Sequence, residues 1–476
     1  MRKLLTIIAC AMVFTSSFAQ TGIVRGSKFD FDSKTEQAPQ VLLKDNYNHY
    51  LCSFTNTVGM LASHKITVRK FDQKNQLVDT FTQDFSLNAF TLHNVHGTYE
   101  VDNNRIVTFV ESYYGKEKKS EIFKYVFDKT TGKFTSEILA TYPILSNIKS
   151  GSLSVSKSEN SRYLSLVYQK YNTKKEPEES ECILLDAKTL NVIFKKTVSF
   201  QDEFYTSEKI VTNTGKIVFL RTPRSYKGTN YLTVIDANGQ EDKNFEESTK
   251  IHKPLAVSIN DQDYLIAFNY RTKGIRRGDF GNIMFYDITQ GKVLSNNEID
   301  GFNSVKDIEQ VNFRYSFMQN NEIHVFVEGK YKEGTKPSVD FPNNPAFTDP
   351  RFVFGPANLL VFGYDGVLKQ NTKLLLENKN NEADFYHSFG VVNIKGEYFV
   401  NTGVYYKNNS HYYGFYKLDA NNKYAATNLN LSYDLIRDYP FKSVNQIVYY
   451  NIDKNQILLA SVFGDSQMSL VSVPMN

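Results

Sequence analysis

Lys124-Tyr-Val-Phe-Asp128 reads as a short apolar strand that ends in an aspartate, and a polar turn containing Gly132 follows it. An aspartate that opens a turn accepts hydrogen bonds from its own backbone, and Gly or Asn supplies the positive φ that such turns need. The pattern therefore predicts a hairpin, and not a calcium loop. Further copies occur at Thr67–Asp72, Cys182–Asp186, Leu232–Asp236, Ile283–Asp287, Leu360–Asp365 and Phe415–Asp419.

The spacing of these aspartates identifies the pattern as half of a structural repeat. Successive aspartates lie 50 to 58 residues apart, except for the step of 78 from Asp287 to Asp365. A second pattern, two apolar strands around a polar turn, precedes each copy, as in Ile210–Leu220 and Phe389–Val400. Each unit thus has four strands, A to D, and four strands at a period of about 50 residues are typical of a β-propeller blade. Helical periodicity of useful length is absent, which excludes a helical solenoid.

The number of half-repeats predicts how the ring closes. Eight A–B halves but only seven C–D halves are found, because the last unit starts near Val444 and has one more strand, Met468–Val473. The segment Gly22–Phe31 can supply the missing outer strand and so protect the exposed edge. We therefore expect an all-β fold in which residues 20–476 form a single β-propeller of eight four-stranded blades, closed by the N-terminal strand. Seven blades is the alternative, if the unit Val41–Thr82 is misread.

The N-terminus has the three parts of a secretory signal peptide. Two positive charges, Arg2 and Lys3, precede the apolar run Leu4–Phe14, and small and polar residues follow. We expect cleavage after Ala19, so that residues 1–19 are removed. Cys10 ends a stretch that resembles a lipoprotein cleavage box, but the residues after it are still apolar, where a lipoprotein has a polar tether.

The compartment follows from the style of this signal. Its end, Ser17-Phe-Ala-Gln20, resembles that of exported Bacteroidota proteins, which implies a periplasmic or outer-membrane-associated protein. The C-terminal Ser469–Asn476 does not resemble the C-terminal secretion signal of that phylum, and this favours the periplasm over the cell surface. No later segment predicts a transmembrane span, since the best candidate, Phe352–Phe362, is interrupted by Gly355, Pro356 and Asn358.

Composition excludes some partners. The formal net charge is +4 and falls to about +2 once Arg2 and Lys3 are removed, which is too small to indicate nucleic acid as a partner. Only Cys52 and Cys182 remain after cleavage, in different repeats and on different strands. An oxidising compartment permits a disulfide, but we expect two separate buried thiols.

The loops between strands B and C are the expected working surface, because they are longer and more varied than the other turns. The B–C loop of blade 6, residues 331–356, has four prolines in its central part, at 337, 342, 345 and 350, and explains the one long repeat step. Long loops of this kind are often functional; a flap packed on its own blade is the alternative. The B–C loop of blade 5 is rich in basic residues suited to an acidic partner. A solvated loop without a binding role is the alternative. The candidate partner-binding residues are Arg271, Lys273, Arg276, Arg277, Tyr331, Phe341 and Phe347.

Catalytic and metal motifs are not found. His93-x-x-His96 resembles half of a metal site, but residues three apart on a strand point to opposite faces unless the backbone bends. A nucleophile elbow, a phosphate-binding glycine loop and a CxxC pair are all missing from the sequence. We therefore predict no catalytic residues, no metal, no cofactor and no enzymatic activity.

Two functions remain. The first is a non-catalytic interaction subunit that docks to a protein, for example an outer-membrane protein. The resemblance to exported Bacteroidota proteins implies machines such as the type IX protein export translocon, although no family-specific motif ties the chain to it. The alternative is a carbohydrate-binding or carbohydrate-active propeller, which requires acidic residues at the ring axis together with exposed aromatic residues; the inner A strands read as mostly apolar or neutral.

Overall fold

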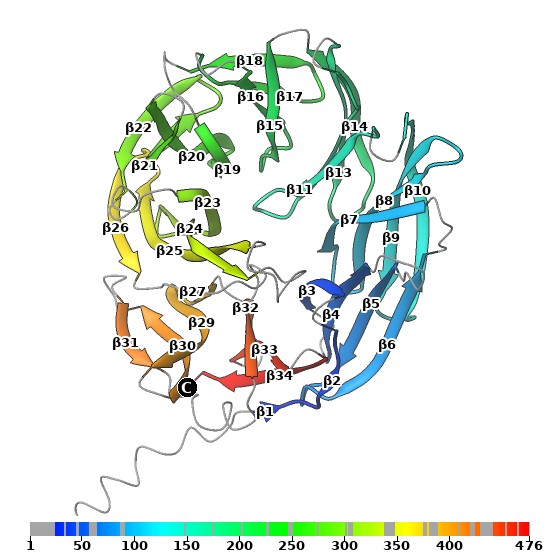
Figure 1. The fold of residues 1–476 in the computed structure, drawn as a ribbon, viewed down its shortest axis with the longest axis vertical. Coiled ribbons are helices and arrows are strands. Elements are labelled where there is room, and N and C mark those ends of the chain that lie inside the picture. Colours follow the sequence, from blue (N-terminus) through cyan, green and yellow to red (C-terminus); the bar gives the residue numbers. More distant parts are fainter. Residues whose placement is uncertain are drawn as a thin grey trace, which may run out of the picture.

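The computed structural model of the chain is a closed ring of eight antiparallel sheets, and the residues that it describes contain no helix (Figure 1). Each sheet is one blade whose strands run A to D from the centre outward, which confirms the eight-bladed β-propeller. The structure describes residues 24–475 except 33–34, 44–46, 57–63, 86–90, 147–148, 174–175, 201–202, 225–227, 246–250, 274–275, 300–301, 303–307, 338–347, 375–377, 380–388, 408–409, 419–423, 429–440, 453–454 and 464–465. The predicted signal peptide, residues 1–19, lies outside this range.

The strands follow the predicted repeat. Blades 1 and 2 are β3 (Glu36–Leu43), β4 (His49–Asn56), β5 (His64–Phe71), β6 (Leu77–Asp84) and β7 (Thr91–Glu100), β8 (Arg105–Tyr114), β9 (Lys119–Asp128), β10 (Lys133–Pro143). Blades 3 and 4 are β11 (Ser152–Lys157), β12 (Tyr163–Gln169), β13 (Glu178–Asp186), β14 (Val192–Phe200) and β15 (Phe204–Val211), β16 (Ile217–Pro223), β17 (Tyr231–Ile235), β18 (Gln240–Asn244).

The longest strands of the ring lie in blades 5 and 6. Blades 5 and 6 are β19 (Ile251–Ile259), β20 (Gln262–Lys273), β21 (Arg276–Asp287), β22 (Lys292–Glu298) and β23 (Ile308–Gln319), β24 (Glu322–Pro337), β25 (Thr348–Gly363), β26 (Leu368–Leu374), with β27 (Asn378–Lys379) beside β25. Blades 7 and 8 are β28 (Gly390–Ile394), β29 (Glu397–Lys407), β30 (Ser410–Leu418), β31 (Tyr424–Asn428) and β32 (Phe441–Asn451), β33 (Gln456–Phe463), β34 (Gln467–Pro474), β1 (Val24–Arg25), β2 (Phe29–Asp30).

The aspartate turns have the predicted structural role. The Asp128 carboxylate accepts the backbone N–H groups of Thr130 at 2.9 Å and Thr131 at 2.8 Å. The aspartates at 72, 186, 236, 287 and 365 accept equivalent backbone bonds. Gly132 has φ of +68°, and a Cβ there would lie 2.4 Å from the ring of Phe81 in blade 1. Glycine is thus required both by the backbone conformation and by the packing of blade 2 on blade 1.

The hydrophobic core lies between blades rather than at the centre of the ring. Apolar side chains from facing sheets form separate clusters at seven successive interfaces, such as Leu166, Tyr168 and Ile183 of blade 3 with Val107 and Phe109 of blade 2. Each blade therefore shares its apolar core only with its neighbours, as expected for a repeat protein. Among the described residues, no helix is long and apolar enough to cross a membrane.

The N-terminal segment closes the ring as predicted. Val24 pairs with Ser472 and Phe29 with Met468, so β1 and β2 together replace the missing outer strand of blade 8 (Figure 1). Blade 1 holds the same segment from the other side: the Asn75 amide donates to the Val24 carbonyl at 3.2 Å and to Ser472 Oγ at 2.8 Å. Closure thus depends on side chains of both the first and the last blade.

Candidate functional site

The B–C connections of blades 5 to 7 are β-hairpin arms rather than irregular loops. β24 and β25 have 16 residues each, and β20 and β21 have 12, compared with 7 in β12 and 9 in β13. The predicted loop 331–356 is therefore mostly strand, with pairs as far out as Pro337 with Thr348. The backbone N–H and C=O groups of the two strands bond to each other. Proline has no N–H to donate, so it is tolerated at positions that face an unpaired strand edge.

The four basic candidates lie on one arm. Arg271 and Lys273 end β20, and Arg276 and Arg277 begin β21. The register pairs Lys273 with Arg276 and Arg271 with Asp279, so the backbone brings the four positions to the tip of the blade 5 hairpin. The sequence predicts a loop at these positions, whereas the structure places them on two paired strands.

The three aromatic candidates are only partly located. Tyr331 lies in β24, is half-buried, and pairs with Ile308 of the inner strand and with Val353 of β25. It therefore sits at the base of the blade 6 arm, where the arm leaves the blade. Phe341 and Phe347 lie outside the described residues. Beyond Tyr331, Lys332 and Thr335 are exposed on the arm.

The inner strands have a feature that the sequence pattern did not reveal. In six of the eight inner strands, the described register with strand B shifts, which marks a β-bulge. A bulge re-aims the side chain of the extra residue. Three of the bulges lie four or five residues before the end of their strand, hence at a similar depth along the axis; their extra residues are His96 in β7, Ser207 in β15 and Arg314 in β23.

Each of these three side chains bonds to the equivalent position of its own strand B. His96 Nε2 lies 3.0 Å from Glu111 Oε2, and the hydroxyls of Ser207 and Thr222 lie 2.8 Å apart. Arg314 Nε donates to Glu328 Oε2 at 2.7 Å. A fourth pair crosses between blades, with Lys253 Nζ of blade 5 at 3.2 Å from Glu208 Oε1 of blade 4. We call these residues the axial belt: His96, Glu111, Ser207, Glu208, Thr222, Lys253, Arg314 and Glu328.

The His93-x-x-His96 pair is separated by one of these bulges. His93 Nδ1 lies 2.7 Å from Ser112 Oγ inside the interface with blade 1, whereas His96 bonds to Glu111. The backbone does bend here, but it sends the two rings to different partners. In the described part of the chain, no three His, Cys, Asp or Glu side chains gather as metal ligands.

One contact spans the ring. Ser316 Oγ of β23 donates to Glu159 Oε1, in the A–B turn of blade 3, at 3.0 Å. In Figure 1 the β11 end of blade 3 reaches into the centre towards β23 and β24. Burial raises the pKa of Glu159, and hydrogen bonds from Ser316 and Asn213 offset part of that effect. This bridge joins blades 3 and 6 on the A–B side of the belt.

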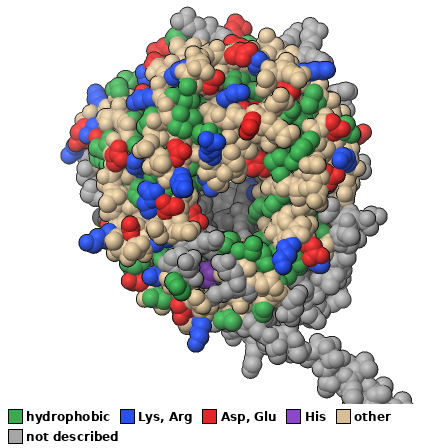
Figure 2. All heavy atoms as spheres, turned by 180° about the vertical axis from the view of Figure 1, so that it is seen from behind, with side chains coloured by type: hydrophobic (Ala, Val, Ile, Leu, Met, Phe, Trp, Pro, Cys, Tyr) green, Lys and Arg blue, Asp and Glu red, His purple; other side chains and the backbone are tan. Residues whose placement is uncertain are grey.

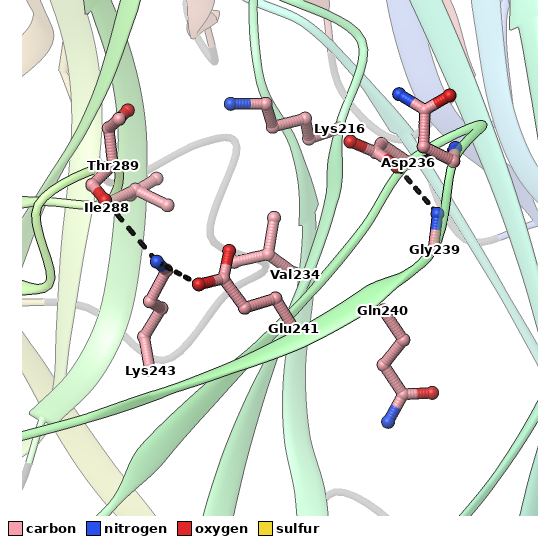
Figure 3. Close-up of a pocket in the computed structure, with 10 residues that line it drawn as sticks. Lys216, Val234, Asp236, Gly239, Gln240, Glu241, Lys243, Ile288 and Thr289 are labelled. Atoms are coloured by element: carbon pink, nitrogen blue, oxygen red, sulfur yellow. Dashed lines mark hydrogen bonds and ion pairs between the residues drawn. The ribbon is translucent and has the colours of Figure 1, made fainter.

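Two shallow pockets lie on the face of the A–B and C–D turns, opposite to the arms. The one between blades 4 and 5 has a volume of about 320 Å³ (Figure 3). Its charged groups already have partners: Lys243 Nζ bonds to Glu241 and to the Thr289 carbonyl, and Asp236 accepts the Gly239 N–H. The neighbouring pocket, of about 450 Å³, shares Lys216, Asp236 and Asn238 with it. These turns have structural roles, so we base no function on the pockets.

No model of a known protein family matches the chain, and no curated protein matches its sequence. Solved β-propellers are similar in fold at low identity. The Dos1 propeller is 10% identical with a TM-score of 0.46 and covers 96% of both chains. The β-propeller domain of the Trilobed protease from Pyrococcus furiosus is 12% identical, TM-score 0.37, over 82% of this chain and 95% of that one. The acylaminoacyl peptidase of Pyrococcus horikoshii is 11% identical, TM-score 0.38, over 91% and 59%.

Proposed function

We propose that the protein is a non-catalytic interaction subunit of the bacterial envelope, and that the arms of blades 5 and 6 dock it to a protein partner. The observation that carries this proposal is the extension of consecutive B–C connections into paired hairpins, on the face of the ring opposite to the A–B and C–D turns. Binding surfaces commonly consist of such variable extensions on a fixed scaffold.

Charge supports an acidic partner. Arg271, Lys273, Arg276 and Arg277 lie at the tip of the blade 5 hairpin, where the register sets one acid, Asp279, opposite Arg271. Arginine forks pair with carboxylates in two-bond geometry, which gives such a surface both orientation and specificity. Salt would weaken this attraction, since exposed charges are screened.

We place the protein in the periplasm, associated with the outer membrane, on the strength of its predicted signal peptide. A partner in an outer-membrane machine such as the type IX protein export translocon fits this location. The partner surface would carry Asp or Glu side chains facing the blade 5 arm and an apolar recess for the blade 6 arm.

Affinity purification from detergent-solubilised envelopes, followed by mass spectrometry, tests the proposal. We expect a stoichiometric outer-membrane partner with the unaltered chain. The double variant Arg276→Glu, Arg277→Glu should lose that partner. So should a chain in which residues 338–347 are replaced by Asn-Gly, a two-residue turn that keeps Pro337 and Thr348 paired.

A matched charge reversal provides the control. Lys74 and Lys188 are exposed on the C–D turns of blades 1 and 3, at the opposite face of the ring. The variant Lys74→Glu, Lys188→Glu should retain the partner. Recovery of the unaltered protein alone, or equal loss in both charge-reversal variants, would contradict docking through the arms.

A further inference from the structure

We propose that the hollow at the ring axis binds a neutral oligosaccharide, and that the axial belt forms its hydrogen-bonding wall. Figure 2 shows one face of the molecule hollowed at its centre. The sequences of the inner strands are mostly apolar or neutral, which predicts few acidic side chains at the ring axis. The structure instead brings Glu111 and Glu328 from strands B, Glu208 from an inner strand and Glu159 from a turn to the inner part of the ring.

Solvent exposure places belt side chains at the hollow. An inner strand is covered by its own strand B and by the two neighbouring blades, so its exposed side chains must face the hollow or its mouth. The side chain of Lys253 is 41% exposed, that of His96 20% and that of Arg314 15%. Ser207 is also exposed. The inner-strand members of the belt are therefore accessible to a ligand, whereas Glu111 and Glu328 on strands B are buried behind them.

The charges of the belt favour a neutral ligand over an ionic one. Arg314 and Lys253 each have a carboxylate within 3.2 Å, and His96 bonds to the fully buried Glu111. Such pairs leave little net charge to attract an ion. They still offer both kinds of hydrogen-bonding group, donors on Arg314 and Lys253 and acceptors on Glu208 and the Ser207 hydroxyl. A sugar hydroxyl both donates and accepts, so a polyhydroxylated chain matches this mixture.

An aromatic side chain completes the site. Tyr205 lies on inner strand β15, two residues before the Ser207 bulge, and is 41% exposed. A tyrosine offers a flat apolar face next to a polar tip, which suits the C–H face of a sugar ring beside the belt hydroxyls. Ligand sites typically combine an aromatic surface with a few placed polar groups.

The Glu159–Ser316 bridge indicates the side of entry. It joins blades 3 and 6 on the A–B side, and Ser316 lies two residues beyond Arg314 along β23. The bridge therefore crosses the ring on the A–B side of the belt. A ligand would enter from the opposite face, which carries the arms. The site is separate from the arm residues, so it does not depend on the docking proposal.

Isothermal titration of the mature protein with four short neutral oligosaccharides tests the inference: an α-1,4-glucan, a β-1,4-glucan, a β-1,4-mannan and a β-1,4-xylan. We expect at least one to bind, with an affinity that stays the same between about 0.05 and about 0.5 M NaCl, since a neutral ligand is not screened. Tyr205→Ala should weaken that binding about five-fold or more. Lys253→Gln, at an exposed position, should weaken it as well.

Tyr47→Ala is the matched control, because Tyr47 is 69% exposed in the A–B turn of blade 1. It should bind like the unaltered protein. Failure to bind any of the four sugars, equal affinity in Tyr205→Ala and Tyr47→Ala, or binding that disappears at high salt would each overturn the proposal. Tyr205→Ala should still capture the envelope partner, so the two proposals can fail separately.

Discussion

Glu159 Oε1 accepts a hydrogen bond from Ser316 Oγ at 3.0 Å, and this contact joins an A–B turn of blade 3 to the inner strand of blade 6. The same turn also holds its neighbour, since the Asn160 N–H donates to Asn213 Oδ1 of blade 4 at 2.8 Å. Propeller blades normally contact only adjacent blades. A cross-ring bond therefore couples parts of the ring that the repeat alone leaves independent.

The pKa of Glu159 predicts how stability changes with pH. Burial raises this pKa in the folded protein, so the charged carboxylate costs stability at neutral pH, and that cost disappears as pH falls through the raised pKa. In Glu159→Gln the group cannot ionise. The Tm of the variant minus that of the unaltered protein should thus be more positive at pH 8 than at pH 5. Glu117→Gln, at an exposed loop position, should give the same small difference at both pH values; parallel curves for Glu159→Gln would refute the assignment.

Asn75 should be a weak point of ring closure when altered. Its φ is +60°, it is fully buried, and its amide bonds to Val24 and Ser472. Asn75→Ala should lower the free energy of unfolding by about 3 kcal/mol, from two lost hydrogen bonds and the positive φ. Asn75→Gly also loses both hydrogen bonds, but glycine adopts the positive φ without strain. Its free energy of unfolding should therefore fall by only about 2 kcal/mol.

Chemical denaturation measures both losses, and limited proteolysis followed by N-terminal sequencing locates them. The first cleavage in Asn75→Ala should fall near residues 24–31. Asn238→Ala, on the exposed turn of blade 4, should change stability by less than about 0.5 kcal/mol. First cleavage elsewhere would mean that Asn75 does not hold the closing strand.

The pair Arg221 and Glu178 links blades 4 and 3 by a buried ion pair. Arg221 Nη1 lies 2.6 Å from Glu178 Oε1, and the guanidinium carbon lies 3.9 Å from the centre of the Phe200 ring. Arg221→Met should cost about 3–5 kcal/mol, because it leaves a buried carboxylate unpaired. Adding Glu178→Gln should recover part of that loss in urea denaturation. An equal or larger loss in the double variant would show that the pair itself is not the cause.

The two thiols should be unreactive in the folded protein. Cys52 and Cys182 are buried and not joined, as predicted, and burial raises the pKa of each to about 12. The thiolate is the reactive form. With the protein lacking residues 1–19, which include Cys10, Ellman's reagent at pH 8 should therefore detect no thiol until denaturant is added, and then two. Rapid reaction of either thiol before unfolding would contradict the packing at that site.

Much of the fold could be predicted because each blade repeats the same local signals. Aspartates such as Asp128 mark the C–D turns, and the uneven half-repeats predicted that residues near Val24 and Phe29 pair with blade 8. These features depend on neighbouring residues in the sequence or on a count of strands, both of which can be read without a structure.

The belt and the bridge could not be predicted in this way. A bulge such as that at His96 depends on a one-residue mismatch between two strands, and apolar alternation looks the same on either side of it. The partners Glu111 and Glu328 lie on strands B, and their spacing in the sequence does not indicate that their side chains approach the inner strands. The Glu159–Ser316 contact joins residues 157 positions apart and requires the closed ring. The hairpin form of the arms likewise depends on pairing between β24 and β25 across a proline-rich stretch.

Site-specific photo-crosslinking in intact cells tests the central claim most directly. A photoreactive amino acid is placed at Lys332 or Thr335, both exposed on the blade 6 arm, and at Lys74 or Lys188, both exposed on the opposite face. Docking through the arms predicts one discrete crosslinked envelope protein from positions 332 and 335 and none from 74 and 188. The same product from the C–D turn positions, with none from the arm, would contradict the account.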